Sequence, residues 1–443
     1  EKGIEYAASI DCQLIIALDC GIRALNMADL SKKKGIDLII CDHHIPGSIL
    51  PKAHAVLDPK RKDCRYPFKE LSGCGVGFKL LQGFCLQHTL DLGSLFKYLD
   101  LVAVSIASDI VPMVGENRIL AYFGMQKINS QPLKSLQALI DIAGIKAPIS
   151  ISDVVFYIGP RINAAGRLRH AHESVDLLIN EDPVQLKDFA QRLNEVNKKR
   201  QNIDQTITEE ALRTIHEELP ETAKSTVLFN PKWHKGIVGI VASRCIEHYF
   251  RPTIILTESN GVATGSARSI EGFDIHAALG KCADLLLQYG GHAFAAGMSL
   301  ALNNVDLFKE RFEEIVKNTI PPDSERPKLI VDAQVPLDFI HFKNFNILNQ
   351  MTPFGPQNMQ PVFVTEHVKL VGSPKLIKEK HLKIQVKQGD TEVPIEAIAF
   401  GLGGLQAPIL AAESFRIAYH IDLNEFRGRK RLQLIVKDIK FYN

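Results

Sequence analysis

The sequence predicts a multidomain α/β protein that ends in a small β-barrel. Near the N-terminus, short apolar runs alternate with helix-length segments, which is typical of a parallel sheet with crossover helices. One long amphipathic segment then separates two regions of different pattern. The C-terminal region holds six short strand patterns with turn signals between them, which favours a barrel over the alternative, a β-sandwich.

The first region, residues 1–182, begins with the alternating pattern. "LIIAL" at 14–18 and "DLIIC" at 37–41 are expected to be parallel strands, joined by a helix over 24–35 that ends at a glycine. "HAVLDP" at 54–59 is a candidate third strand, and helical patterns dominate from there to the end of the region. A chain of 443 residues is too long for one core, so several domains are expected.

A single long helix is expected over 183–217. Asp182 and Pro183 form a good N-cap and first-turn pair, and apolar residues then recur at spacings of three and four. Arg200 breaks this apolar seam. We interpret the segment as a connector between domains; the alternative is a long core helix inside one domain.

A second α/β domain is expected over 222–318, and a Pro-rich linker follows it. Its strands are predicted at 225–230 and 252–258, on either side of a helix. Two glycine-rich stretches then follow, a loop at 261–272 and "QYGGHAFAAG" at 288–297. The barrel is expected over 327–443, and an oligonucleotide-binding barrel is the leading interpretation of its six strand patterns.

The composition restricts the class of protein. The formal net charge of +2 neither requires nor excludes a nucleic-acid partner. None of the eight cysteines forms a Cys-x-x-Cys pair, so we expect reduced, packed thiols and no zinc ribbon. No apolar run reaches the roughly 18 residues that a membrane span needs, and there is no signal-peptide pattern. We therefore expect a cytoplasmic protein without a membrane partner.

Acidic and imidazole side chains follow the predicted strands. Asp19 comes directly after the first strand, and Asp42, His43 and His44 come directly after the second. Ligands bind at the carboxyl ends of parallel strands, so these groups are expected at one edge of the sheet. Asp109 closes another apolar segment and is a third candidate. The alternative is that the aspartates only cap the following helices.

This combination of side chains indicates a divalent cation. Carboxylate with imidazole suits Mn²⁺, Fe²⁺ or Zn²⁺, and carboxylate alone suits Mg²⁺. Because His43 and His44 are neighbours, they are expected to point differently, one toward the metal and the other toward the substrate. Asp42 is expected to orient an imidazole.

Four segments rich in small residues are candidates for binding an anion. "SGCGVGFKL" at 72–80 opens a helix. Its glycines can be explained equally well by N–H groups left free to bind an anion or by close packing of the helix. The other candidate side chains are Arg161, Asn163 and Arg167, then Ser266 and Arg268, and finally His292 after two glycines. Packing against the long helix is the alternative for the first three. The barrel region carries a group of basic residues that are expected to hold a single strand of nucleic acid; the alternative is a solvated face. They are Lys375, Lys378, Lys380, Lys383, Arg427, Arg429, Lys430 and Arg431.

The chemistry that these parts indicate is metal-assisted hydrolysis of a phosphodiester. Several motifs together resemble the RecJ family of single-stranded-DNA-specific 5′→3′ exonucleases, within the DHH phosphoesterase superfamily. They occur in the order of the family: "ALDCGI", "CDHHIPG", "SGCGVGFKL", "IASDIVP", "GPRINAAGRL", "WHKGIVGIVASR", "GSARS", "GGHAFAAG" and "NEFRGRKRLQLIVKDI".

The resemblance implies a DHH domain, a connecting helix, a DHHA1 domain and an OB-fold barrel, with the active site in the cleft between the DHH and DHHA1 domains. Asp19, His43 and Asp109 would bind Mn²⁺ or Mg²⁺, two ions in the intact protein, and Asp42 and His44 would complete the catalytic signature. The six anion-binding candidates would contact the 5′-phosphate and the DNA backbone. The implied reaction releases 5′-mononucleotides from single-stranded DNA during DNA repair and recombination.

The resemblance also sets further expectations. The implied partners are single-stranded DNA, single-stranded-DNA-binding protein and a RecQ-type helicase, and the implied state is a monomer. The family's first motifs, which supply further metal-binding carboxylates, would precede Glu1. This chain alone is therefore expected to lack the first part of the DHH domain, to bind metal poorly and to be inactive.

Two alternatives remain open at this point. The first is a phosphoesterase of the same superfamily that acts on short oligonucleotides or cyclic dinucleotides. The second is a non-catalytic DNA-binding or scaffold relative.

Overall fold

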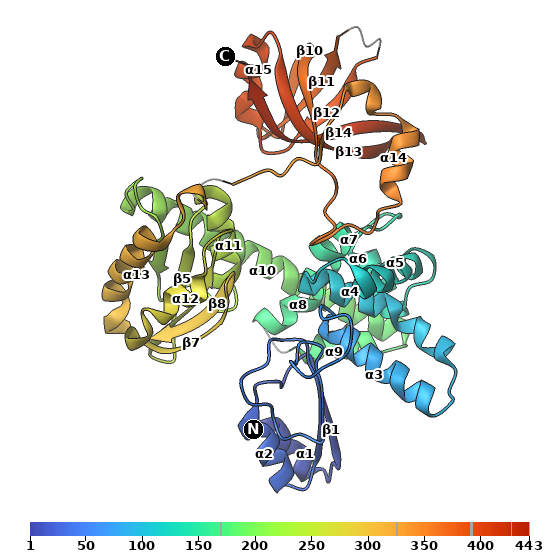
Figure 1. The fold of residues 1–443 in the computed structure, drawn as a ribbon, viewed down its shortest axis with the longest axis vertical. Helices are drawn as coiled ribbons and strands as arrows, with labels where there is room; N and C mark the ends of the chain where they lie inside the picture. The colour runs from blue at the N-terminus through green and yellow to red at the C-terminus, as the bar shows by residue number, and fades with distance from the viewer. Residues whose placement is uncertain (169–170, 325–326, 390–392, 427, 443) are drawn as a thin grey trace. The chain divides into compact units, whose positions relative to one another are not determined.

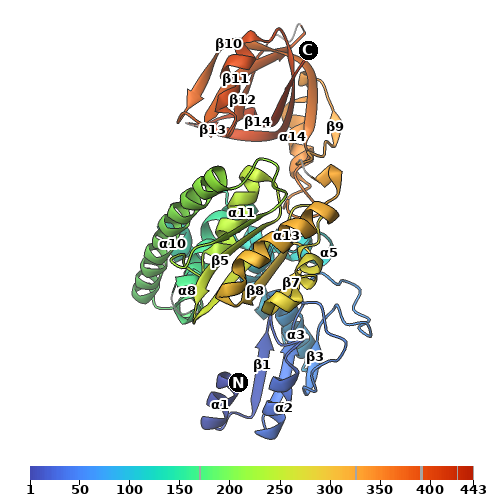
Figure 2. The same ribbon diagram turned by 90° about the vertical axis from the view of Figure 1, so that its left-hand side faces the viewer.

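The computed structural model describes residues 1–168, 171–324, 327–389, 393–426 and 428–442. Figure 1 shows it as a ribbon, and Figure 2 shows the same ribbon turned by 90°. Contacts divide the chain into two compact units. The first comprises residues 1–133, 146–155 and 329–443, and the second comprises residues 134–145 and 156–328.

The first unit begins with a parallel three-stranded sheet of order β1-β2-β3. Strand β1 (Leu14–Leu18) and strand β3 (Ala55–Leu57) both pair in parallel with β2 (Asp37–Cys41). Helix α2 (Leu25–Lys33) connects the first two strands, and Gly35 ends this segment with a φ of +72°, which favours glycine. The predicted parallel β-α-β arrangement and the candidate third strand are therefore confirmed.

Helices fill the rest of this part of the first unit. They are α1 (Lys2–Ser9), α3 (Gly73–Gln87), α4 (Leu99–Asp109), α5 (Gly115–Ser130) and α7 (Ile151–Asp153). Helix α3 starts at a true cap, because the Ser72 hydroxyl accepts a hydrogen bond from the Gly75 N–H. Its apolar face packs with α4 and with the end of β2 in one buried cluster, which includes Cys41, Phe78 and Ile106. This cluster fixes the helices against the edge of the sheet where the strands end.

The second unit is organised around α10 (Pro183–Glu218), a helix of 36 residues. Its first turn is capped by Asp182, which accepts hydrogen bonds from the N–H groups of Val184 and Gln185, as the sequence predicts. At 1.5 Å per residue the helix is about 54 Å long. It packs against α6 (Lys134–Ala143), α8 (Gly159–Leu168), α9 (His172–Ile179) and α11 (Val238–Tyr249).

The second unit also contains a five-stranded sheet of order β4-β5-β6-β8-β7. The strands are β4 (Thr226–Phe229), β5 (Thr253–Ser259), β6 (Val262–Arg268), β7 (Leu286–His292) and β8 (Ala295–Leu300), and helices α12 (Ile275–Gly280) and α13 (Val305–Thr319) complete the fold. Only β4 and β5 are parallel, and the other pairs are antiparallel.

This sheet corrects the sequence-based prediction of a glycine-rich loop at 261–272. Residues 262–268 form strand β6, which lies between β5 and β8. Small residues are poor strand formers, but here they are needed, since a Cβ on Gly265 would lie 2.2 Å from the carbonyl oxygen of Ile255. Ser266 and Arg268 are therefore held by a central strand and do not lie on a loop.

The C-terminal part of the first unit is a closed barrel. Strands β10 (Phe363–Ile377), β11 (His381–Gln388), β12 (Ile395–Ala399), β14 (Arg429–Phe441) and β13 (Phe415–Phe426) follow one another around it, and β10 pairs with β11 to close the ring. The short strand β9 (Ala333–Gln334) adds to β10, and helices α14 (Phe342–Asn349) and α15 (Gln406–Ala411) complete this part. The closure confirms the predicted barrel, with the topology of an oligonucleotide-binding fold, and excludes the sandwich.

Two expectations from composition can be compared with the structure. All eight cysteines are free thiols, but only four are buried and Cys20 is exposed, so the prediction of packed thiols is confirmed only in part. Within the described residues, no helix has both the length and the apolar character that crossing a membrane requires.

Candidate metal and nucleic-acid sites

His43 stands between two carboxylates at the edge of the parallel sheet. Its Nε2 lies 3.1 Å from Asp19 Oδ1 and 3.3 Å from Asp109 Oδ2. These three residues come from the end of β1, the end of β2 and the last residue of α4. The sequence places them 24 and 66 positions apart, and the fold brings their side chains to one point.

The other ring nitrogen of His43 determines what its Nε2 can do. Nδ1 lies 3.0 Å from the carbonyl oxygen of Leu71, which can only accept a hydrogen bond, so Nδ1 carries the proton. Nε2 is buried and has no hydrogen-bond partner. A neutral ring therefore directs a lone pair toward two carboxylates, an arrangement that is stable only with a cation or a proton between them. The nearby carboxylate of Asp19, together with that of Asp109, raises the pKa of His43, although burial opposes this.

Two of these residues, with His44 as the third, make a suitable set of ligands for a divalent ion. Asp19, His43 and His44 each offer a ligand atom, and these atoms lie within 4.8 Å of one another. Burial raises the pKa of Asp109, with Asp19 adding to the effect, whereas His43 opposes it. Carboxylate oxygen with imidazole nitrogen suits Mn²⁺ well, and an unpartnered buried imidazole nitrogen is the observation that supports such a site.

Asp42 orients this part of the chain without facing the cluster directly. Its carboxylate is 1% exposed, and Oδ2 accepts a hydrogen bond from the Ile22 N–H at 2.9 Å. Oδ1 accepts from the N–H groups of His43 and His44, and it lies 2.7 Å from His44 Nδ1. Burial alone would raise the pKa of Asp42, but these hydrogen bonds outweigh it and lower the pKa. Asp42 therefore stays ionised and fixes the exposed His44 ring.

Backbone geometry places Asp19. This residue has a φ of +64°, a left-handed conformation that is uncommon for a residue other than glycine. Gly73, the first residue of α3, lies directly against it, and a Cβ on Gly73 would lie 2.0 Å from Asp19 Oδ1. The glycine-rich start of α3 is thus explained by close packing on the Asp19 carboxylate. Ile110, which ends α4 after Asp109, also has a positive φ of 56°.

Two neighbours of the cluster were missed by the sequence analysis. Asp58 follows β3 as Asp19 follows β1, is 2% exposed, and has one oxygen without a partner. Burial raises the pKa of Asp58, and the charge of Asp42 adds to this. Lys60 lies close enough to lower the pKa of both His43 and Asp109. The signal was present in the sequence, because an aspartate after a third strand repeats the pattern of the first two.

The predicted phosphate-contact residues on α8 differ in their surroundings. Arg161 donates from Nε to Asn194 Oδ1 on α10 at 3.1 Å and from Nη1 to the Tyr157 carbonyl, contacts that fit the packing alternative. Asn163 is exposed on the same helix. Arg167 is also exposed, and its Nη1 donates to the carbonyl of Gly236, just before α11.

The remaining predicted residues lie on the five-stranded sheet. Arg268 at the end of β6 donates from Nη1 to the Ser266 hydroxyl at 2.7 Å, so these two side chains act together. Burial and the charge of Arg167 lower the pKa of Arg268. His292 is exposed at the β7–β8 hairpin, where its Nδ1 accepts from the Phe294 N–H at 3.3 Å. The chain thus brings Arg167 near the Ser266–Arg268 pair, while His292, within the described residues, makes no hydrogen bond or ion pair with them.

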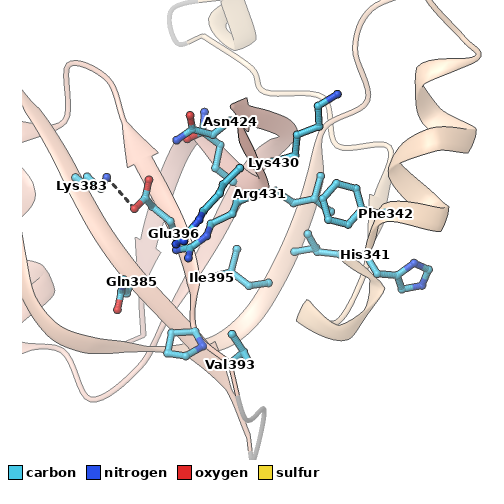
Figure 3. A pocket seen from close by; sticks show the side chains of 15 residues that line it. His341, Phe342, Lys383, Gln385, Val393, Ile395, Glu396, Asn424, Lys430 and Arg431 are labelled. Atoms are coloured by element: carbon cyan, nitrogen blue, oxygen red, sulfur yellow. Dashed lines mark ion pairs between the residues drawn. The ribbon is translucent and has the colours of Figure 1, made fainter. Parts of the chain in front are cut away.

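The barrel has a wide groove of about 1000 Å³ on one side. Figure 3 shows it from close by, with the Lys383–Glu396 ion pair of 2.8 Å joining two neighbouring strands. Phe342 at the start of α14 is 46% exposed and lines the groove together with Lys430. The other residues of the lining are His341, Gln385, Asn424, Arg429, Arg431 and Gln433, with apolar residues between them.

Only part of the predicted basic patch lines this groove. Lys383, Arg429, Lys430 and Arg431 contribute to its walls, whereas Lys375, Lys378 and Lys380 lie on or beside the β10–β11 hairpin. Arg427 lies outside the described residues. An exposed aromatic ring beside cationic side chains is the combination that stacks bases and holds a phosphate backbone.

Comparison with known proteins agrees with this arrangement. Three family profiles match the chain: the DHH family N-terminal domain over residues 2–106, the DHHA1 domain over 222–318 and the RecJ OB domain over 331–438. The single-stranded-DNA-specific exonuclease RecJ of Escherichia coli is 33% identical over 457 residues, which cover 98% of this chain and 78% of that protein. The chain belongs to the RecJ family.

Other RecJ proteins are similar to the chain over different shares of their length. The RecJ exonuclease of Bacillus subtilis is 36% identical over 96% of this chain. The crystal structure of RecJ from Thermus thermophilus in complex with Mn²⁺ superimposes over the whole chain with a TM-score of 0.87 at 26% identity. The chain spans 53% of the Bacillus RecJ and 64% of the Thermus RecJ chain.

Proposed function

We propose that this chain carries the catalytic and strand-binding parts of a metal-dependent 5′→3′ exonuclease, which releases 5′-mononucleotides from single-stranded DNA. The single observation that carries the proposal is the buried Nε2 of His43 between the carboxylates of Asp19 and Asp109. Membership of the RecJ family, whose relatives are named single-stranded-DNA-specific exonucleases, supports the substrate and the reaction.

We propose Mn²⁺ or Mg²⁺ as the cofactor, with two ions in the intact protein. Asp19, His43 and Asp109 would hold the ion, which supplies Lewis-acid polarisation of the scissile phosphate when it is bound. His43 is prepared for this role, because Leu71 fixes its tautomer and leaves Nε2 as the ligand atom. The relatives whose crystal structures contain Mn²⁺ support this choice of metal.

His44 is proposed to act on the substrate directly. Its ring is exposed, and its Nδ1 is bound to the ionised Asp42, so Nε2 is the atom that can contact a phosphate oxygen or transfer a proton. Asp42 would then position the His44 ring and, through the N–H groups of His43 and His44, the main chain of residues 42–44. This division of work leaves His43 for the metal and His44 for the substrate.

The strand itself is proposed to be held at two further places. In the barrel groove, Phe342 would stack on a base while Lys430 and Arg431 contact phosphates. In the second unit, Arg167, Ser266 and Arg268 would bind the 5′-phosphate. Three further residues are proposed to contact the DNA: Arg161, Asn163 and His292. Arg161 has the weakest support, because its Nε and Nη1 already donate hydrogen bonds to Asn194 and Tyr157.

The direct test compares substrates with Mn²⁺ present. The chain is incubated with 5′-labelled single strands, duplexes and dinucleotides, and the full-length RecJ of Escherichia coli is assayed beside it as a reference. We expect mononucleotides from the long single strand only. Preference for dinucleotides would instead support the short-substrate phosphoesterase, and strand binding without Mn²⁺ binding or hydrolysis would support a non-catalytic relative.

The cellular role is proposed from the family. It comprises DNA repair and recombination in the cytoplasm, by a monomer that works with single-stranded-DNA-binding protein and a RecQ-type helicase. Light scattering during size-exclusion chromatography tests the monomer, and titration with each purified partner tests the two interactions.

A further inference from the structure

One amide on the outside of the barrel has an atom without a hydrogen-bond partner. Gln433 of β14 lines the barrel groove, yet it is only 8% exposed. Within the described residues its Oε1 is buried and accepts no hydrogen bond. An unpaired buried acceptor is unfavourable in the free protein, so a ligand that brings a hydrogen-bond donor to this atom gains affinity.

A neighbouring carboxylate fixes the orientation of this amide. Gln433 Nε2 donates to Asp422 Oδ2 of β13 at 2.9 Å. A carboxylate only accepts hydrogen bonds, so the nitrogen end of the amide must face Asp422 and the oxygen end must face away from it. Rotating the amide would place two acceptors against each other. The unpaired atom is therefore a fixed acceptor, which selects ligands that carry a donor.

The register of the strands places Gln433 within a polar row. Gln385 of β11 pairs with Glu396 of β12, which pairs with Gln433. Asp422 pairs with Gln433 on its other side. Side chains of directly paired residues lie on the same face of a sheet, and the next positions along the strands face the other way. Those next positions are all buried and apolar: Ile384, Ala397, Leu434 and Ile421. The polar row therefore faces away from the barrel core.

This polar row is rich in acceptors. Gln433 stands between two carboxylates, Asp422 and Glu396, and Glu396 forms an ion pair of 2.8 Å with Lys383 (Figure 3). One contact occupies only part of the acceptor capacity of a carboxylate. The exocyclic amino group of a nucleobase carries two N–H donors and suits such a row. The keto oxygen that replaces it in thymine and uracil is another acceptor and does not.

The walls of the barrel groove are suited to bring a base to this row. Phe342 is exposed at the start of α14 and offers a face on which a base can stack. Lys430 and Arg431 of β14 supply charges for the phosphates. A strand held by stacking and by phosphate contacts keeps the edges of its bases free for hydrogen bonds with the rest of the lining, which includes Gln433.

We propose that Gln433 is a specificity-determining residue, which makes the barrel groove prefer single strands whose bases carry an exocyclic amino group, such as cytosine, over thymine and uracil. Gln433 Oε1 accepts one N–H of that amino group, and a carboxylate of the row can accept the other. The inference rests on the proposed function for the presence of a single strand in the groove. It adds that the groove distinguishes between bases as well as holding the backbone.

The test measures binding by fluorescence anisotropy in the presence of EDTA, which prevents hydrolysis. The ligands are labelled deoxyoligonucleotides of equal length, one built of cytosine and one of uracil, at a slightly alkaline pH that keeps cytosine neutral. We expect the wild-type chain to bind the cytosine strand about fivefold more tightly. A third strand, built of 2-pyrimidinone, keeps the cytosine ring without its amino group, and it should bind as weakly as the uracil strand.

Substitutions then assign the preference to one residue. Gln433→Met keeps the length of the side chain but removes the acceptor. It should abolish the preference and leave the dissociation constant of the uracil strand within about twofold. Gln385→Met is the matched control, because it removes an exposed amide from the same polar row. Within the described residues no hydrogen bond orients the Gln385 amide, so this change should alter the affinity for both strands by the same factor.

The outcomes separate this inference from the proposed function. Equal binding of the cytosine and uracil strands by the wild-type chain would overturn the inference and leave the proposed function standing. Retention of the preference in Gln433→Met would overturn the role of Gln433. Gln433→Leu takes its place if the Met variant fails to fold, as judged by thermal unfolding. Binding of none of the strands would overturn the proposed strand-binding role of the groove, and this inference with it.

Discussion

The metal cluster and the barrel groove place their side chains in different ways. In the cluster, main-chain features fix Asp19 and His43: Asp19 has a left-handed backbone, Gly73 packs directly against its carboxylate, and the Leu71 carbonyl sets the tautomer of His43. In the barrel, long side chains such as Lys430 line a wide groove with a volume of about 1000 Å³. Hydrolysis needs atoms placed to a fraction of an ångström, whereas holding a strand tolerates movement. Single substitutions should therefore have unequal effects at the two places.

The largest effect is expected at His43. Replacement by alanine removes the only imidazole between the two carboxylates and leaves Asp19 and Asp109 to repel each other. Mn²⁺ affinity, measured by calorimetry, should fall by about 100-fold or more. His54→Ala is the control, because this histidine also lies near an aspartate, 3.5 Å from Asp37, but both side chains are exposed. Equal losses in the two variants would show that the cluster has no special role.

The second test concerns the backbone contact behind Asp19. Gly73→Ala puts a Cβ where Asp19 Oδ1 now lies, so the carboxylate must move although no ligand has been removed. Mn²⁺ affinity should fall by about tenfold or more. Gly83→Ala, in the same helix α3 and with nothing within 4 Å of its added Cβ, should leave it unchanged. If Gly73→Ala binds Mn²⁺ normally, the claim that main-chain packing positions the cluster is wrong.

A smaller effect is expected in the groove. Phe342→Ala removes one stacking surface, so affinity for single-stranded DNA should fall by about tenfold, as measured by fluorescence anisotropy. Phe400→Ala is a matched control, because Phe400 is 57% exposed on the barrel but does not line the groove. If Phe342→Ala lowered DNA affinity by as large a factor as His43→Ala lowers Mn²⁺ affinity, the contrast between the barrel groove and the metal cluster would be wrong.

The smallest effect concerns stability. Because burial raises the native pKa of Asp58 above its unfolded value, this group stabilises the fold at low pH, and that contribution is lost as the pH rises through the native pKa. Asp58→Asn should therefore raise the free energy of unfolding at neutral pH by on the order of 1 kcal/mol and flatten its dependence above about pH 4. Urea unfolding at several pH values measures this.

The control for that experiment is Asp63→Asn. Asp63 is exposed, and its pairing with Arg61 lowers its pKa, so its contribution has the opposite sign and is present above the unfolded pKa. If Asp58→Asn lowers stability at neutral pH, then the carboxylate form of Asp58 is favourable, and our account of its environment fails.

Much of the fold followed from the sequence because local patterns determine it. The apolar runs before Asp19 and Asp42 predicted two strands, and parallel strands end at one edge, so the meeting of these groups was predictable. The first strand is only partly covered, since Leu14, Ile16 and Leu18 of β1 are exposed. The long helix followed from its cap and its seam. The strand β6 did not, because its small residues are typical of loops, and only pairing with β5 and β8 makes them a strand.

The sequence alone determined which reactive side chains are present and where they lie along the chain. It showed which carboxylates, imidazoles and guanidinium groups follow each predicted strand or helix. The tertiary structure decided how they are used. It placed His43 between two carboxylates and His44 beside Asp42, brought Gly73 into contact with Asp19, and buried Asp58. The reason is physical: spacing along the chain fixes which face or edge a residue occupies, but distances between atoms, burial and compensation of charge arise only when elements from distant positions pack together.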